Sequence, residues 1–145
     1  MTDEVALREG EHISISIDRV PADVYEFVSN PVNAPTWAKG LAGTITNVDG
    51  EWIADSPMGK VKVRFADRNQ LGVLDHDVTL PSGVTIHNPL RVIPNGRGSE
   101  VVFSLFHQPG VSDARFAEDA RAVKRDLASL KQVLEGMAAP RLGRP

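Results

Sequence analysis

An amphipathic helix predicted at the end of the chain constrains the fold more than any other feature. Between Ser112 and Met137, apolar residues recur at steps of three and four along one face. This stripe comprises Phe116, Ala120, Val123, Leu127, Leu130 and Leu134. Ser112 is a suitable N-cap, and Asp113 lies favourably beside the positive end of the helix dipole. A helix of this length must bury its apolar face against another element.

The preceding residues predict a meander of strands as the partner of this helix. Alternating or apolar stretches are separated here by turn signals. Strands are expected at 12–18, 44–48, 52–55, 60–65, 72–80, 84–93 and 100–107. Two short helices are expected after the first strand, at 21–28 and at 35–39, the second closed by Gly40. We therefore expect an α+β fold in which a curved sheet of seven antiparallel strands grips the terminal helix, with a space between them.

Composition sets the class of protein. The 145 residues fit one domain, which we expect to span 1–137, followed by a flexible tail at 138–145. No apolar run approaches the roughly 20 residues that cross a bilayer, so no membrane insertion is expected. The net charge of -3 argues against a nucleic-acid partner, which requires clustered positive charge. We also expect the protein to be cytoplasmic and to be a monomer or a homodimer.

Several kinds of reactive site are absent from the sequence. The chain has no cysteine, which excludes disulfides, thiolate zinc sites and a cysteine nucleophile. No nucleophile elbow, phosphate-binding loop or dinucleotide fingerprint occurs. The histidines and carboxylates show no spacing that would bring three metal ligands together. We expect neither a metal nor a cofactor.

Two polar residues interrupt the apolar face of the predicted sheet. The three-residue loop 81–83 has glycine at its left-handed position and pairs Leu80 with Val84. Because side chains alternate between faces along a strand, this register places His76 opposite Asn88 on the apolar face. Their β-carbons would lie about 5 Å apart.

Two further turns extend this row across the sheet. The dipeptide Asn95-Gly96 predicts a hairpin that pairs Pro94 with Arg97 and so sets Asn88 opposite Phe103. A four-residue loop at 67–70 sets Val61 opposite His76. The predicted transverse row is therefore Val61, His76, Asn88 and Phe103.

This row has three interpretations. His76 and Asn88 could satisfy each other as a structural pair, since a buried polar group without a partner costs about 1–3 kcal/mol. They could instead offer donors and acceptors to a bound molecule. A bulge that turns His76 outward is the third interpretation. Asp75 and Asp77 should point to the opposite face, so neither can orient the His76 ring as the acid of a catalytic triad would.

The other candidate residues carry weaker predictions. Trp37, between the short helices and the sheet, is either a core residue or part of a cavity wall. His12 and His87 alternate onto the solvent side, and His107 ends an inward row at the rim of the cavity. The facing of Trp52 is undecided. Lys60, Lys62 and Arg64 form a row on the solvated face of the sheet.

The first strand and helix carry a family resemblance. Ile13–Asp18, followed by Pro21–Pro31 and then Trp37, resembles the START-like (SRPBCC) superfamily, and looks closest to members of the polyketide cyclase/dehydrase-like group. The resemblance covers the chain through its terminal helix. It implies a helix-grip fold, a seven-stranded antiparallel sheet around the long helix with a hydrophobic cavity between them. Relatives carry lipids, sterols, plant hormones or polyketides, some cyclise or dehydrate aromatic polyketides, and others stimulate a chaperone ATPase.

These observations lead to one main functional hypothesis and two alternatives. The main hypothesis is the binding of a small hydrophobic, lipid- or polyketide-like molecule in the cavity. The expected ligand-binding residues are Trp37, Val61, Val63, Leu74, His76, Ile86, Asn88, Phe103, Leu105, Val123 and Leu127. The first alternative is a cyclase or dehydratase in which His76 is the general acid or base and Asn88 hydrogen-bonds the developing oxyanion. The second is a protein-interaction module resembling the chaperone-ATPase activators.

Overall fold

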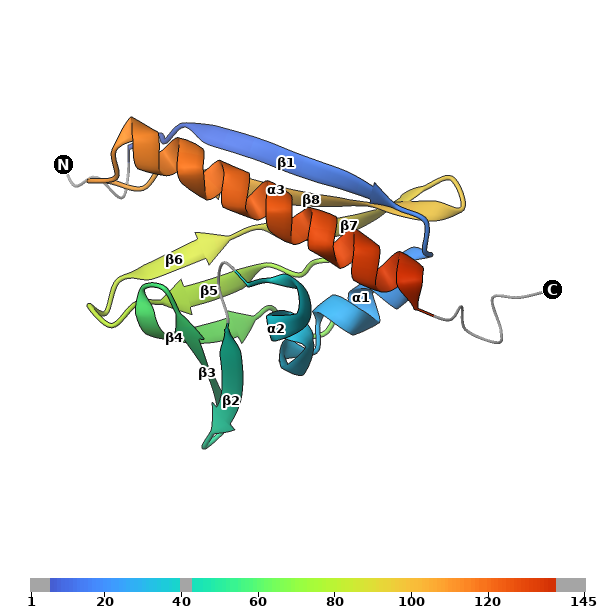
Figure 1. The fold of residues 1–145 in the computed structure, drawn as a ribbon, viewed down its shortest axis with the longest axis horizontal. Coiled ribbons are helices and arrows are strands. Elements are labelled where there is room, and N and C mark those ends of the chain that lie inside the picture. The colour runs from blue at the N-terminus through green and yellow to red at the C-terminus, as the bar shows by residue number, and fades with distance from the viewer. Residues whose placement is uncertain (1–5, 40–42, 138–145) are drawn as a thin grey trace.

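A long helix lies along a curved antiparallel arrangement of strands in the computed structural model, which describes residues 6–39 and 43–137 (Figure 1). The elements are β1 (Gly10–Ile17), α1 (Pro21–Val28), the 3-10 helix η2 (Pro31–Asn33), α2 (Ala34–Trp37), β2 (Thr44–Val48), β3 (Glu51–Ser56), β4 (Gly59–Phe65), β5 (His76–Thr79), β6 (Thr85–Asn88), β7 (Leu90–Asn95), β8 (Gly98–Phe106) and α3 (Asp113–Gly136). Gly40 and the predicted tail 138–145 lie outside the described residues. The α+β class and the long terminal helix are as predicted.

The prediction of one seven-stranded sheet is wrong. The described residues form eight strands in two sheets, with strand orders β1-β8-β7 and β2-β3-β4-β5-β6. The additional strand arises because Pro89 divides the expected strand 84–93 into β6 and β7. Proline has no N–H to donate to a strand ladder, so it interrupts strand pairing.

The register across the β5–β6 hairpin is as predicted. His76 pairs with Asn88 and Val78 with Ile86 across the β5–β6 hairpin. Val48 pairs with Glu51 across the β2–β3 turn. In that turn Asp49 and Gly50 both have positive φ, of 51° and 89°, as a type I′ turn requires.

The predicted register between β4 and β5 is wrong by four residues. Phe65, and not Val61, lies opposite His76. The loop before β5 is longer than predicted because Asn69 holds it: the Asn69 Oδ1 atom accepts the N–H groups of Leu71 and Val73, at 2.9 and 3.1 Å. These local side-chain hydrogen bonds compete with a strand ladder. As a result, the predicted strand 72–80 is reduced to β5.

The predicted register between β7 and β8 is wrong by two residues. Pro94 pairs with Ser99, and Phe103 therefore lies opposite Leu90 instead of Asn88. Gly96, with a φ of 56°, is the first central residue of the turn, as in a type II′ hairpin. Gly98 is thereby placed against β1, where a β-carbon would lie 2.6 Å from the carbonyl oxygen of Ile17. Both register errors are even numbers, so each side chain keeps its predicted face.

The two sheets meet where Asp75 lies beside the start of β7. The Asp75 carboxylate accepts the backbone N–H of Leu90 at 2.9 Å and two hydrogen bonds from the Arg91 guanidinium at 2.8 Å each. The backbone N–H of Leu74 also donates to the carbonyl of Leu90 at 2.8 Å. Asp75 therefore joins the five-stranded sheet to the three-stranded one.

Both ends of α3 are fixed by hydrogen bonds. At its first turn, the Ser112 hydroxyl accepts the backbone N–H of Arg115 at 3.1 Å, as predicted for the N-cap. At its last turn, the Arg19 guanidinium donates to the carbonyl of Leu134, which is favourable at the negative end of the helix. Lys131 reaches the Ser16 carbonyl at 2.7 Å. These contacts hold α3 along β1 (Figure 1).

The hydrophobic core lies mainly beneath the second half of α3. Leu127, Leu130 and Leu134 are almost fully buried there, together with Ile17 of β1 and Val101 of β8. The predicted apolar stripe of α3 thus faces the strands. Among the described residues, no helix is long and apolar enough to cross a membrane.

Candidate functional site: a cavity beneath the terminal helix

A cavity of about 400 Å³ lies between α3, α2 and the inner face of the strands. This volume falls within the range of roughly 300–1,000 Å³ that is typical of small-molecule sites. Most of the wall is apolar. Its apolar side chains include Trp37, Ile45, Val63, Phe65, Val78, Ile86, Phe103, Leu105, Phe106, Phe116, Val123 and Leu127.

Most of the residues predicted to bind a ligand lie on this wall. They are Trp37, Val63, His76, Ile86, Asn88, Phe103, Leu105, Val123 and Leu127. Val61 and Leu74 are placed elsewhere: both are buried in the core, at 1% and 2% exposure, and neither lines the cavity. The register difference between β4 and β5 explains Val61, because that difference moves Phe65 into the position beside His76.

Besides Phe106, two aromatic residues of the wall were missing from the prediction. Phe65 comes from β4, and its ring centroid lies 5.1 Å from that of His76. Phe116 comes from the first turn of α3. A sequence signal existed for both, since Phe65 continues the inward alternation of β4 and Phe116 belongs to the apolar stripe of α3.

His76 is the buried ionisable group of the wall, with 6% of its surface exposed. Its Nδ1 atom lies 3.1 Å from the carbonyl oxygen of Leu74. A carbonyl oxygen only accepts, so the ring proton is on Nδ1 and the Nε2 lone pair remains an acceptor. Burial lowers the pKa of His76 below its ordinary value, which favours this neutral form. Phe103 lies on the other side of the ring, at a centroid distance of 6.1 Å.

Asn88 also lines the cavity and lies opposite His76, as predicted. Among the described residues no hydrogen bond joins the two side chains, and His76 Nδ1–H instead faces the Leu74 carbonyl. In the part of the chain that the structure describes, the Asn88 amide has no other side-chain hydrogen bond. The interpretation as a self-satisfied structural pair is therefore wrong, and so is a bulge that turns His76 outward.

The neighbouring aspartates lie on the outer face, as predicted. Asp77 accepts a hydrogen bond from the exposed His87 at 2.7 Å. Asp75 is engaged at the junction of the sheets. Neither can therefore orient the His76 ring.

Trp37 lies on the wall of the cavity and is 8% exposed. Its indole Nε1 is a buried donor that has no hydrogen-bond partner among the described residues. Such orphaned N–H groups are rare in native proteins, because burial removes their hydration without replacing it. Trp37 therefore fits both predicted interpretations, since it belongs to the buried core and also lines the cavity.

Charged side chains of α3 form the edge of the cavity. Arg115 and Asp119 make an ion pair of 2.9 Å there, and Arg125 is exposed. His107 stacks on Phe116 with a centroid distance of 4.5 Å, which places it next to the cavity edge. Within residues 6–39 and 43–137, no three His, Asp or Glu side chains gather as a metal site would require.

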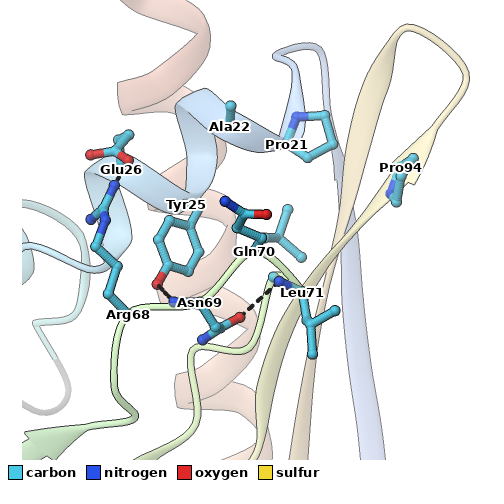
Figure 2. A pocket seen from close by; sticks show the side chains of 11 residues that line it. Pro21, Ala22, Tyr25, Glu26, Arg68, Asn69, Gln70, Leu71 and Pro94 are labelled. Carbon is cyan, nitrogen blue, oxygen red and sulfur yellow. Dashed lines mark hydrogen bonds and ion pairs between the residues drawn. The ribbon is translucent and has the colours of Figure 1, made fainter.

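A second hollow, of about 650 Å³, lies on the outside of the molecule between α1, the loop before β5 and β7 (Figure 2). Its polar groups are largely paired with one another. Arg68 forms an ion pair with Glu26, and the Tyr25 hydroxyl accepts the backbone N–H of Asn69 at 2.9 Å. Because these groups already have partners, this hollow offers a ligand less than the cavity beneath α3 does.

Comparison with known proteins shows which solved structures share this fold, but it does not show the activity of the protein. Neither family models nor curated sequences give a match. Solved structures do. The Aha1 dimer from Colwellia psychrerythraea matches with a TM-score of 0.70 and 14% identity, over 88% of this chain and 96% of that one. Ara h 8.0201 matches with a TM-score of 0.65 and 12% identity, over 89% of this chain and 99% of that one. DynU16, from the dynemicin biosynthetic locus, matches with a TM-score of 0.67 and 14% identity, over 89% of this chain and 48% of that one.

The chain shares the fold of these solved structures. At these identities the likeness shows the fold alone, and the helix-grip arrangement predicted from the sequence agrees with it. The three solved structures share one fold but are described as different kinds of protein. Function must therefore be argued from the residues of the cavity.

Proposed function

We propose that the protein binds a small, largely apolar molecule in the cavity between α3 and the sheet. The observation that carries this proposal is the cavity itself, about 400 Å³ with a mostly apolar wall. Binding there would remove apolar surface from water, which contributes roughly 25 cal/mol per Å². The START-like fold supports the proposal, since it is the fold of Ara h 8.0201 and DynU16.

A neutral fluorescent probe tests the proposal directly. N-phenyl-1-naphthylamine should bind the full chain with enhanced emission. Val123→Phe adds volume to the wall on α3, and we expect it to weaken binding about tenfold or more because the cavity is filled. Lys124→Phe is the matched control, since Lys124 is exposed, adjacent on α3 and not part of the wall. Equal affinities for both variants, each verified as folded by circular dichroism, would contradict the proposal.

A second candidate is catalysis at His76, because its neutral ring is held by Leu74 with Nε2 free as a base. Such a base would take a proton from the carbon beside a ligand carbonyl. The electron pair of that C–H bond would move to the carbonyl oxygen, where Asn88 is the expected donor. This candidate corresponds to the predicted cyclase or dehydratase activity.

Deuterium exchange distinguishes this candidate from simple binding. With 2-acetylnaphthalene in D₂O, a catalytic His76 should exchange the acetyl protons faster than solvent does, as followed by proton NMR. His76→Gln should abolish the excess rate and leave binding of the ketone largely intact. Exchange at the uncatalysed rate in the unmutated protein would reject catalysis on this probe and leave the binding function standing.

The protein-interaction module is the remaining alternative, and its fold likeness is to Aha1. A module of that kind would act through its surface and would need no internal cavity. The described residues instead enclose a cavity of about 400 Å³ with a mostly apolar wall. This observation favours the ligand-binding proposal.

A further inference from the structure

The outer hollow between α1, β7 and the loop before β5 is lined by apolar side chains that the described residues leave in water (Figure 2). Leu71 is 81% exposed there. Ala22 and Pro94 are also exposed, and Pro21 lies beside them in the lining. One exposed leucine is ordinary on a protein surface, whereas an apolar patch around a concave surface is typical of an interaction site.

The loop that carries Leu71 is fixed on both sides of the hollow. The Asn69 Oδ1 atom accepts the backbone N–H of Leu71 at 2.9 Å, and the backbone N–H of Asn69 donates to the Tyr25 hydroxyl of α1 (Figure 2). On the other side, the N–H of Val92 in β7 donates to the Gly72 carbonyl at 2.9 Å. A side chain at Gly72 would collide with the Val92 carbonyl, so the loop lies directly against β7. These contacts hold Leu71 in water at the hollow.

The described part of the chain ends close to this hollow. The Arg19 guanidinium donates to the carbonyl of Met137, the last described residue, at 3.3 Å. Arg19 precedes Pro21 of the hollow by only two residues, and Val20 between them is an exposed apolar residue. Eight residues, 138–145, follow Met137. An extended chain of that length spans about 26 Å, which is enough to reach the hollow.

The sequence of segment 138–145 suits an apolar hollow. It contains Pro140, Leu142 and Pro145. Proline-containing segments dock on surfaces that present aromatic side chains, and Tyr25 lines this hollow. Because proline fixes φ, a segment that contains it loses less conformational freedom when it docks.

Charge contributes little to this match, and the tether contributes more. Glu26 is an acidic residue of the lining, and it already pairs with Arg68. Arg141 and Arg144 can therefore stay in water while Leu142 makes contact. A tethered segment has an effective concentration on the order of millimolar at a surface within its reach. A weak apolar contact that a free peptide or a second copy would not sustain is therefore sufficient here.

We propose that segment 138–145 docks in the outer hollow of its own chain, with Leu142 against Leu71. The docked segment covers apolar surface that the described residues leave in water. This proposal is independent of the ligand site beneath α3, and either can hold without the other. Any other molecule that uses the outer hollow has to displace the segment.

A spin label tests the proposal in the full chain. Because the sequence has no cysteine, Gly143→Cys gives a single attachment point for a nitroxide, next to Leu142. In ¹H–¹⁵N NMR spectra, the label should remove most of the intensity of the Leu71 and Ala22 amide resonances. The amide of Val84, in the turn between β5 and β6 at the opposite end of the molecule, should keep its intensity (Figure 1). Equal intensities at Leu71 and Val84 would overturn the proposal.

Variants of the labelled chain separate docking from mere proximity, because a tethered label visits nearby surfaces even when nothing holds it. Leu142→Asp removes the apolar side chain from the segment, and Leu71→Asp removes it from the hollow. In either variant the Ala22 resonance should recover most of its intensity. Val84→Asp is the matched control, since Val84 is exposed and outside the hollow, and should change nothing. Unchanged broadening in either of the first two variants, or recovery in the control, would contradict the proposal.

A mixed sample shows which chain supplies the segment. Spin-labelled chain at natural isotope abundance is mixed with ¹⁵N-labelled chain that carries no nitroxide. If each segment docks on its own chain, the Leu71 resonance of the ¹⁵N-labelled chain should keep its intensity. Loss of that intensity would mean that the segment docks on a second copy, and the proposal would be wrong.

Discussion

At the scale of single residues, His76 carries the most information about the interior. It is a titratable ring inside an apolar wall, its proton is held by a backbone carbonyl, and burial keeps its pKa below the ordinary value. A polar group in such a position imposes a pH dependence on folding, whatever the ligand is.

This dependence can be measured as the difference between the unmutated protein and His76→Phe. The unfolded chain binds a proton to His76 as the pH falls through about 6.5, whereas the folded chain resists it. Stability from this group is therefore complete above the unfolded pKa and is lost on acidification toward the folded pKa. The expected slope from this group is at most about 1.4 kcal/mol per pH unit between pH 5 and 7. Urea unfolding curves that shift in parallel for both proteins would show that His76 takes up its proton equally in both states.

The facing of His76 and Asn88 could be predicted from sequence, but their hydrogen bonds could not. Period-two alternation and the tight loop 81–83 were enough to place both on the inner face and opposite each other. Which partner the imidazole takes depends on the position of the Leu74 carbonyl, two residues before it. That position is set by the irregular loop before β5, for which alternation gives no signal.

At the scale of elements, the junction between the two sheets depends on Asp75. Its side chain is 14% exposed and accepts three hydrogen bonds, from the Leu90 N–H and the Arg91 guanidinium. The bonds from Arg91 are the main reason that the pKa of Asp75 lies below its ordinary value. The lowered pKa means that this contribution to stability is present above about pH 4 and is lost as the pH falls further.

Asp75→Asn should therefore weaken the junction. The amide keeps one acceptor but loses the charge, so we expect the free energy of unfolding to fall by about 1–3 kcal/mol at pH 7 in urea titrations. The amide proton of Leu90 should also exchange faster with solvent. Asp55→Asn is the control, because its ion pair with Lys60 is exposed and should matter little. A loss in the control as large as that in Asp75→Asn would rule out a special role for the junction.

Prediction of the elements succeeded where short-range chemistry decides the structure. The α3 stripe, its Ser112 cap and the β5–β6 hairpin are all encoded within a few residues. The register across the β4–β5 connection was wrong because Asn69 gathers the loop through side-chain hydrogen bonds. The prediction of the β7–β8 turn was wrong, and in the observed turn Gly98 lies close to the Ile17 carbonyl of a strand distant in sequence, a contact that the local pattern does not show. The break between β6 and β7 did have a local signal, Pro89 itself, but the apolar residues on either side of it suggested one continuous strand at 84–93.

At the scale of the whole molecule, the cavity follows from how α3 is held. The second half of α3 packs into the core and is fixed by Arg19 and Lys131, while its first half carries Phe116 and Val123 over the space in front of the five-stranded sheet. The sequence predicted that such a space would exist, but its volume depends on the distance between helix and sheet. No local pattern encodes that distance.

The location of a bound probe tests the central claim most directly. In a ¹H–¹⁵N NMR titration of the full chain with N-phenyl-1-naphthylamine, we predict that the largest shift changes fall on the cavity wall, at Trp37, His76, Asn88 and Val123. The outer hollow lined by Arg68 and Leu71 should be nearly unaffected. Changes confined to that outer hollow, or none at saturating probe, would contradict a ligand site beneath α3.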